Sequence, residues 1–205
     1  MVLKRTPGAL KVRSSYDRSA REFKNAEMAA DVSAAELDQV QIDRKLVERA
    51  VEALDRAMKA GVRVFTAESC TGGLIATVLS EAPGAAEHFD GGFVTYTPEQ
   101  KCLALKLNEG LINKFGTVSA EVAEAMARGA LDCSQAGIAV SVTGVAGPEP
   151  DERGNPVGLV YFACARRDGN CVEVKREFGD IGRSRIRYEA AWEALALIAA
   201  AAKVQ

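Results

Sequence analysis

The sequence predicts an α/β protein in which helices cover both faces of a mixed, mainly parallel sheet, a three-layer α/β/α sandwich. Short apolar runs typical of strands alternate with segments of helical periodicity. Two of these runs, 157–166 and 171–178, flank Arg167-Asp168-Gly169-Asn170, whose turn-forming residues predict a hairpin. That hairpin would make part of the sheet antiparallel. The Ala-rich segment 182–203 predicts a final helix.

A long amphipathic helix is expected before the first strand. Ser33 and Glu36 have the spacing of a capping box. Apolar residues then recur on one helical face until Gly61. They are Ile42, Leu46, Val47, Ala50, Val51, Leu54 and Met58. We expect this face to pack against the sheet. A break in the helix near residue 42 stays open.

The middle of the chain alternates between strand and helix signals. Strands are expected at 62–67, 92–97 and 137–143, and helices at 72–81, from Pro98, and at 119–133. Pro98 suits the first position of a helix, and Ser119 is a good N-cap with Glu121 favourable in the first turn. The loop 144–156, rich in Pro and Gly, follows a strand end, where open α/β sheets usually bind ligands.

Composition bounds the class of protein. The 205 residues, 48% hydrophobic and 26% charged, are enough for one well-buried domain. The sequence shows neither an apolar run of about 18 residues nor a secretory signal, so we expect a cytoplasmic protein with no membrane partner. The five cysteines are odd in number and form no CxxC pair, which argues against a disulfide framework or a zinc site. We interpret most of them as small buried apolar residues.

Charge is unevenly distributed along the chain. Residues 1–24 carry a net charge of +5, and the remainder carries −7. We therefore divide the chain into a basic arm, 1–32, and one domain, 33–205. The arm fits a solvated, partly disordered extension, although a nucleic-acid contact, a membrane contact or a transit segment stays open. The acidic body argues against nucleic acid as the main partner, and we expect deletion of residues 1–30 to leave any activity of the body nearly unchanged.

The segment Glu-Ser-Cys-Thr-Gly-Gly at 68–73 joins an apolar run to a predicted helix. Hydroxyl groups and free backbone N–H groups at a helix N-terminus suit an anion or a developing oxyanion, and the glycines permit close approach. This indicates a reactive centre. The alternative is that Ser69 or Thr71 only caps the helix.

The available catalytic bases are few. His88 is the single histidine, and its position before a predicted strand favours a surface residue. A metal site is poorly supported, because no HExxH-like spacing occurs. Tyr96 lies at the end of the second strand and Lys101 about one turn into the following helix, and both could face the 68–73 turn. A lysine accepts a serine proton only when burial or positive potential lowers its pKa from about 10.4; otherwise Lys101 is a solvated helix residue.

Several motifs in one order resemble the C-terminal domain of the competence/damage-inducible protein CinA, over residues 44–203. They are ESCTGG at 68–73, GGFVTYTPEQK at 91–101, GTVSAEVAEAM at 116–126, SVTGVAGP at 141–148, NPVGLVYFA at 155–163 and the GD/IR elements at 179–187. The resemblance implies a nicotinamide-nucleotide amidohydrolase of pyridine nucleotide salvage. Such an enzyme converts nicotinamide mononucleotide into nicotinate mononucleotide and ammonia, and it needs no cofactor. The resemblance also suggests a homo-oligomer.

Carried over to this sequence, the family pattern makes Ser69 the nucleophile and Lys101 its base, with Tyr96 nearby. Cys70 is the competing nucleophile, although no histidine is evidently placed to pair with it. The residues implied in substrate binding are Thr71, Gly72, Gly73, Thr143, Gly144, Gly147, Arg183 and Arg187. The two arginines would meet the phosphate, unless either is an ordinary helix-surface residue.

This chain also departs from the family pattern. Residues 148–155 read Pro-Glu-Pro-Asp-Glu-Arg-Gly-Asn in place of a glycine-rich loop, and their three acidic residues would weaken a phosphate contact. The run Gly179-Asp180-Ile181-Gly182-Arg183 leaves open which arginine meets the phosphate. A catalytically silent nucleotide-binding or protein-interaction module is therefore the second hypothesis. Release of ammonia by the purified protein would separate the two.

Overall fold

Five strands form one mixed sheet in the computed structural model, which describes residues 42–202. The strands are β1 (Val64–Glu68), β2 (Phe89–Val94), β3 (Ile138–Gly144), β4 (Leu159–Arg166) and β5 (Cys171–Glu177), in the order β2-β1-β3-β4-β5. β1 pairs in parallel with β2 and β3, while β4 pairs antiparallel with β3 and β5. β4 therefore opposes the other strands, which confirms the predicted mixed sheet and its hairpin.

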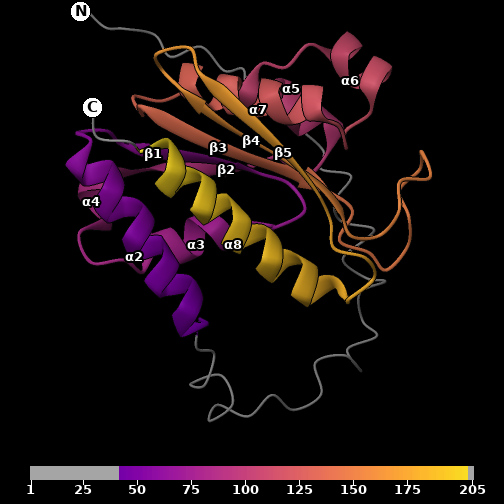
Figure 1. Ribbon diagram of the computed structural model, residues 1–205. Coiled ribbons are helices and arrows are strands. Elements are labelled where there is room, and N and C mark those ends of the chain that lie inside the picture. The colour runs from indigo at the N-terminus through magenta and orange to yellow at the C-terminus, as the bar shows by residue number, and fades with distance from the viewer. Residues whose placement is uncertain (1–41, 203–205) are drawn as a thin grey trace, which may run out of the picture. The chain divides into compact units, whose positions relative to one another are not determined.

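Helices cover both faces of the sheet (Figure 1), which confirms the three-layer sandwich. One face carries α2 (Arg44–Lys59), α3 (Leu74–Ser80) and α8 (Arg183–Ala201), with the short α4 (Ala85–His88) beside them. The other carries α5 (Pro98–Leu105), α6 (Glu109–Phe115) and α7 (Ala120–Asp132). Two separate apolar clusters, one on each face, bury side chains such as Phe162 and Met126. Each such side chain contributes about 1.5–3 kcal/mol.

The starts of α2 and β2 differ from the prediction. α2 begins at Arg44, because the Asp43 carboxylate accepts hydrogen bonds from the amides of Lys45 and Leu46. The predicted capping box lies outside the described residues, so the proposed boundary at residue 32 stays a prediction. β2 begins at Phe89, ahead of the glycine pair that was expected to open it. A Cβ on Gly92 would lie 1.9 Å from Thr66 Oγ1, so this glycine lets two strands approach closely.

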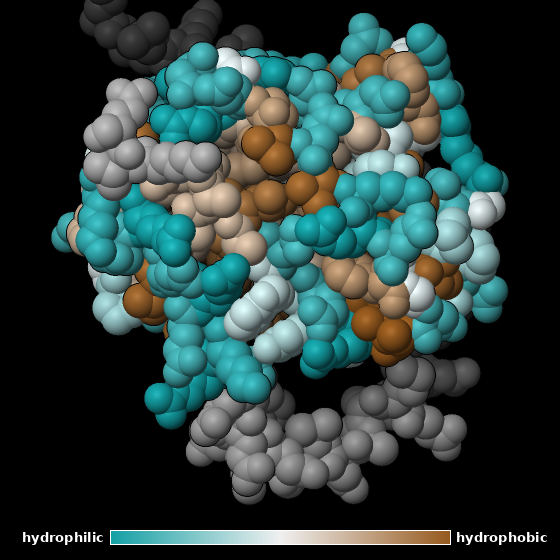
Figure 2. Space-filling view, viewed as in Figure 1, coloured by the Kyte–Doolittle hydropathy of each residue, from teal (hydrophilic) through white to brown (hydrophobic). Residues whose placement is uncertain are grey.

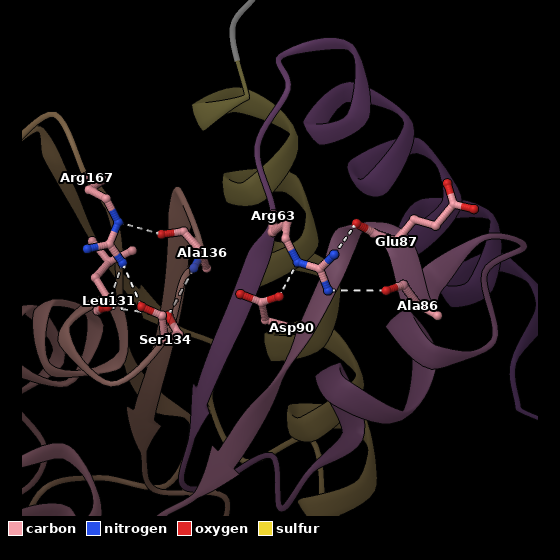
Figure 3. Close-up of polar contacts among 8 residues, drawn as sticks. All are labelled: Arg63, Ala86, Glu87, Asp90, Leu131, Ser134, Ala136 and Arg167. Carbon is pink, nitrogen blue, oxygen red and sulfur yellow. Dashed lines mark hydrogen bonds and ion pairs between the residues drawn. The ribbon is translucent and has the colours of Figure 1, made fainter.

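Two arginines close the edge of the sheet at which β1 and β3 begin (Figure 3). Arg63 forms an ion pair with Asp90 and donates to the carbonyls of Glu87 and Ala86, at 2.6 and 3.2 Å. Arg167 donates to three carbonyls that follow or end α7, those of Leu131, Ser134 and Ala136. These contacts fix the connections at the edge where the strands begin. The candidate site lies at the opposite edge of the sheet.

The outer surface in view is mainly polar, as the layered arrangement predicts. Hydrophilic side chains cover most of the face seen in Figure 2, and hydrophobic ones form a patch near its centre. Ion pairs such as Arg44–Glu48 and Lys59–Asp55 lie along the exposed face of α2. Among residues 42–202, no helix has the length and apolar character needed to cross a membrane.

Candidate active site

A pocket of about 1200 Å³ opens at the edge where β1, β2 and β3 end. Ser69 follows β1, Tyr96 lies shortly after β2, and Thr143 is near the end of β3. All three line the pocket, together with Lys101 and Arg183. Parallel strands bring their carboxyl ends together, which is why residues distant in sequence meet here.

Ser69 and Lys101 are in direct contact at the bottom of this pocket. Lys101 Nζ lies 3.0 Å from Ser69 Oγ and donates to the carbonyl oxygen of Thr95 at 2.6 Å. Lys101 is 1% exposed and Ser69 is 8% exposed. α5 aims the lysine inward because the helix begins at Pro98, with the Thr97 hydroxyl accepting from the amide of Gln100.

Burial changes the proton affinity of this lysine. Loss of hydration lowers the pKa of Lys101 from 10.5 to about 8, because the ammonium is penalised more than the neutral amine. A substantial fraction of the lysine is then unprotonated under mildly alkaline conditions. A neutral amine 3.0 Å from a hydroxyl has the geometry and basicity of a general base.

Cys70 differs sharply from its neighbour. Its side chain is 8% exposed, and burial raises the pKa of its thiol to about 12. The thiolate is the nucleophilic form of cysteine, so this thiol is unreactive near neutral pH. Within residues 42–202, the amide N–H of Cys70 donates to no backbone carbonyl, and Cys70 lines the pocket beside Ser69.

The prediction that the amides of residues 71–73 are free is wrong for Gly72 and Gly73. The Glu68 carboxylate accepts from the Thr71 hydroxyl and the Gly73 amide, and the Gly72 amide donates to the Ser69 carbonyl. None of residues 71–73 lines the pocket, and Thr71 is fully buried. The prediction did not consider Glu68 as a partner. An acidic residue just before a helix is the local signal that could have suggested this cap.

Tyr96 and Arg183 lie together on the pocket wall. Tyr96 is 59% exposed, and Arg183 Nη1 donates to its hydroxyl at 3.5 Å. Arg183 also donates to the carbonyl of Gly147. Arg187 is elsewhere: its Nε and Nη2 donate to the carbonyl of Thr71 at 2.9 and 2.6 Å, and it does not line the pocket. Of the two candidate arginines, only Arg183 therefore reaches this pocket.

The segment Thr143 to Gly147 lines the pocket, and packing explains its residue types. The Thr143 hydroxyl donates to the carbonyl of Thr117 at 2.6 Å. A Cβ on Gly144 would lie 2.7 Å from the carbonyl oxygen of Leu159. Gly147 has φ +86, and a Cβ there would lie 2.9 Å from the Val157 side chain. Close approach between protein segments already requires both glycines.

The acidic loop 148–155 forms another wall of the pocket and is attached to α6. The sequence did not predict this helix. The Asp151 carboxylate accepts from the amides of Arg153 and Asn155, which closes the loop. Arg153 Nη2 then donates to the carbonyl of Asn113 at 2.6 Å, near the end of α6. α6 has only seven residues, so helical periodicity gives little signal there.

His88 takes no part in the pocket. It lies at the end of α4, with a half-buried side chain. Within residues 42–202, no three or more His, Cys, Asp or Glu side chains are grouped so that they could hold a metal ion. The expectations that no metal and no cofactor take part stay predictions.

A serine and a buried lysine in contact at the carboxyl edge of an α/β sandwich have the geometry of a nucleophile and its base. The family model for the CinA C-terminal domain matches residues 43–202. The chain belongs to the CinA C-terminal domain family.

Two curated relatives illustrate the range of names in this family. The chain is 42% identical over 151 residues to "Nicotinamide-nucleotide amidohydrolase PncC" of Enterobacter agglomerans, covering 73% of this chain and 90% of that protein. It is 46% identical over 127 residues to a "Putative competence-damage inducible protein" of Caldicellulosiruptor saccharolyticus. That match covers 62% of this chain but only 30% of the relative.

Solved structures agree with this membership. A competence/damage inducible protein from Agrobacterium tumefaciens superimposes with a TM-score of 0.77 at 40% identity, covering 80% of this chain and all of that one. A CinA superfamily protein from Escherichia coli gives a TM-score of 0.70 at 32% identity, covering 78% of this chain and 92% of that one.

Proposed function

We propose that this chain hydrolyses the carboxamide of nicotinamide mononucleotide to nicotinate mononucleotide and ammonia. The observation that carries the proposal is the 3.0 Å contact between Ser69 Oγ and Lys101 Nζ, with a lysine pKa lowered to about 8. The relative named as a nicotinamide-nucleotide amidohydrolase supports the choice of substrate, because it is matched over 90% of its length.

In the first step, Ser69 Oγ attacks the carboxamide carbon while Lys101 Nζ accepts the hydroxyl proton. The Cys70 amide lies next to the nucleophile and is free to donate to the developing oxyanion. Lys101 then donates its proton to the leaving nitrogen, the C–N bond breaks, and ammonia departs. An ester between Ser69 and the nicotinoyl group remains.

The second step uses the same lysine, now unprotonated. Lys101 takes a proton from water, and the resulting hydroxide attacks the ester carbonyl. The C–O bond to Ser69 breaks, the serine recovers its proton, and nicotinate mononucleotide is released. The Thr95 carbonyl contact orients the amine through both steps, because it occupies one of its donor positions.

We assign the phosphate to Arg183, since it lines the pocket and its hydrogen-bond partners are neutral oxygens. Thr143, Gly144 and Gly147 form the adjacent wall and would contact the nucleotide through their backbone. Tyr96 would help to position the substrate beside Arg183. Arg187, Thr71, Gly72 and Gly73 are proposed to support the turn that carries Ser69. Arg187 donates to the Thr71 carbonyl and lies against Gly72, and the Gly73 amide donates to Glu68, all away from the pocket.

We further propose that the protein acts in the cytoplasm, in pyridine nucleotide salvage, as a homo-oligomer and without a cofactor. These points rest on the family to which the chain belongs. Sedimentation of the purified protein would test the assembly.

The direct test is incubation of the purified protein with nicotinamide mononucleotide. We expect nicotinate mononucleotide and ammonia in equal amounts. The second candidate is a module that binds the nucleotide without turnover, which the acidic side chains of Glu149 and Glu152 on the pocket wall favour. Saturable binding with no ammonia release from folded protein would support the module and contradict the enzyme.

A further inference from the structure

We propose that Glu68 is a positioning residue that holds Ser69 and Lys101 at their reactive separation. The inference rests on the proposed function and adds to it a residue outside the pocket. Glu68 is the last residue of β1 and directly precedes Ser69. Its side chain is 1% exposed and does not line the pocket, so it acts on the reaction through other residues.

The carboxylate of Glu68 gathers hydrogen bonds from the turn that contains the nucleophile. Its Oε2 accepts from the Thr71 hydroxyl at 2.7 Å, the Gly73 amide at 3.0 Å and the Ile75 amide at 3.1 Å. Its Oε1 accepts from the Ala76 amide at 2.8 Å. Gly73 is the N-cap of α3 and has no side chain, so Glu68 does the capping from the preceding strand. Ser69 lies within the segment that these bonds close.

The backbone of Glu68 connects the same residue to the base. Its carbonyl oxygen accepts from the Thr95 amide at 2.8 Å and from the Thr95 hydroxyl at 3.4 Å. The Thr95 carbonyl in turn accepts from Lys101 Nζ at 2.6 Å. Glu68 therefore holds the turn that contains Ser69 through its side chain, and it holds Lys101 through Thr95. Both halves of the reactive pair are fixed to one buried residue.

The chemistry of this position requires a carboxylate. All four partners are donors, and a carboxylate only accepts. In glutamine, the NH₂ group would face either the Ala76 amide or the three donors on Oε2. A buried donor then faces another donor, which forces the turn to shift. A shift of about 1 Å at a reacting group can cost about 100-fold in rate.

The experiment compares Glu68→Gln with Glu81→Gln, the same change at an exposed glutamate that follows α3. We expect Glu68→Gln to lower kcat by about 10- to 100-fold while KM changes by less than about threefold. Phosphonylation of Ser69 by a fluorophosphonate, which needs the serine and lysine but no nucleotide, should slow by a similar factor. Glu81→Gln should leave both rates unchanged. Ser69→Ala should remove the label, which verifies its site.

Folded Glu68→Gln protein with wild-type kcat and labelling would overturn the inference. If Glu68→Gln does not fold, Thr71→Val removes one donor to the carboxylate, and we expect slower labelling; an unchanged rate would overturn the inference there. If unmodified protein is labelled but does not hydrolyse nicotinamide mononucleotide, slower labelling of Glu68→Gln still supports positioning while the proposed substrate fails. Unmodified protein that neither labels nor hydrolyses would overturn both.

Discussion

The two sides of the pocket are built in different ways. The side that carries Ser69 and Lys101 is buried, and strand ends and carbonyl contacts hold it in place. The side formed by residues 148–155 is largely exposed. Its acidic residues face solvent or bond to their own loop, and Arg153 bonds to α6. From this contrast we expect burial to control the reactivity of the Ser69–Lys101 pair, and exposed loop residues to affect substrate preference without disturbing that pair.

Replacing the buried base should have the largest effect. Lys101→Met keeps the volume of the side chain and removes the amine, so we expect kcat to fall by about 10²- to 10⁴-fold. The double variant with Ser69→Ala should be little worse than either single one, because the two groups act as one unit. Lys59→Met, at an exposed lysine of α2, is the control. Near-normal turnover by Lys101→Met would show that the reaction does not need the buried amine.

The pH dependence should follow the same residue. The base is active when unprotonated, and burial lowers the pKa of Lys101 to about 8. We expect kcat/KM to rise about tenfold per pH unit below 8 and to level off above it. The profile is measured from pH 6 to 10 with nicotinamide mononucleotide. A profile that stays flat down to pH 6 would show that no buried lysine controls the rate.

We expect Arg183 to contribute to substrate recognition by binding the phosphate. We expect Arg183→Ala to reduce kcat/KM for nicotinamide mononucleotide by at least about tenfold, since a charge-assisted bond contributes about 1.5–3 kcal/mol. Nicotinamide riboside lacks the phosphate and should be a poorer substrate, with little further loss in the variant. Arg187→Ala should not change the ratio between the two substrates. Equal efficiency on both by the unmodified protein would remove the phosphate from the model.

The exposed loop charges should have the smallest effect. Glu149→Gln combined with Glu152→Gln removes negative charge from the pocket wall. We expect KM for the nucleotide to fall by about two- to threefold at low salt, with kcat unchanged, because solvent screens exposed charges. The difference should shrink in high salt. A large change in kcat would mean that the loop acts on the reactive pair.

The sequence predicted those features that depend on local signals. The 68–73 turn, the Ser119 N-cap and the hairpin at 167–170 each have short-range chemistry, and the structure contains all three elements. The family motifs also pointed to Ser69 and Lys101. Their roles stay predictions, although the structure places the two side chains in contact.

The remaining features depend on contacts between distant segments. The local sequence does not distinguish Lys101 from an ordinary helix lysine. Only the packing of α5 shows that this lysine is buried. The bond from Arg153 to Asn113 joins a loop to a helix that has no periodic signal of its own. The Glu68 carboxylate accepts from amides that the sequence pattern leaves available to a bound anion, and the pattern does not show which acceptor they bind.

The central claim is that Ser69, and not the adjacent Cys70, forms the bond to the substrate. The direct measurement is the rate of nicotinate mononucleotide formation by Ser69→Ala and by Cys70→Ala, each verified as folded. We predict no turnover by Ser69→Ala. Cys70→Ala should keep substantial activity, because burial raises the pKa of the Cys70 thiol to about 12. An active Ser69→Ala beside an inactive Cys70→Ala would contradict the account and indicate a cysteine amidase.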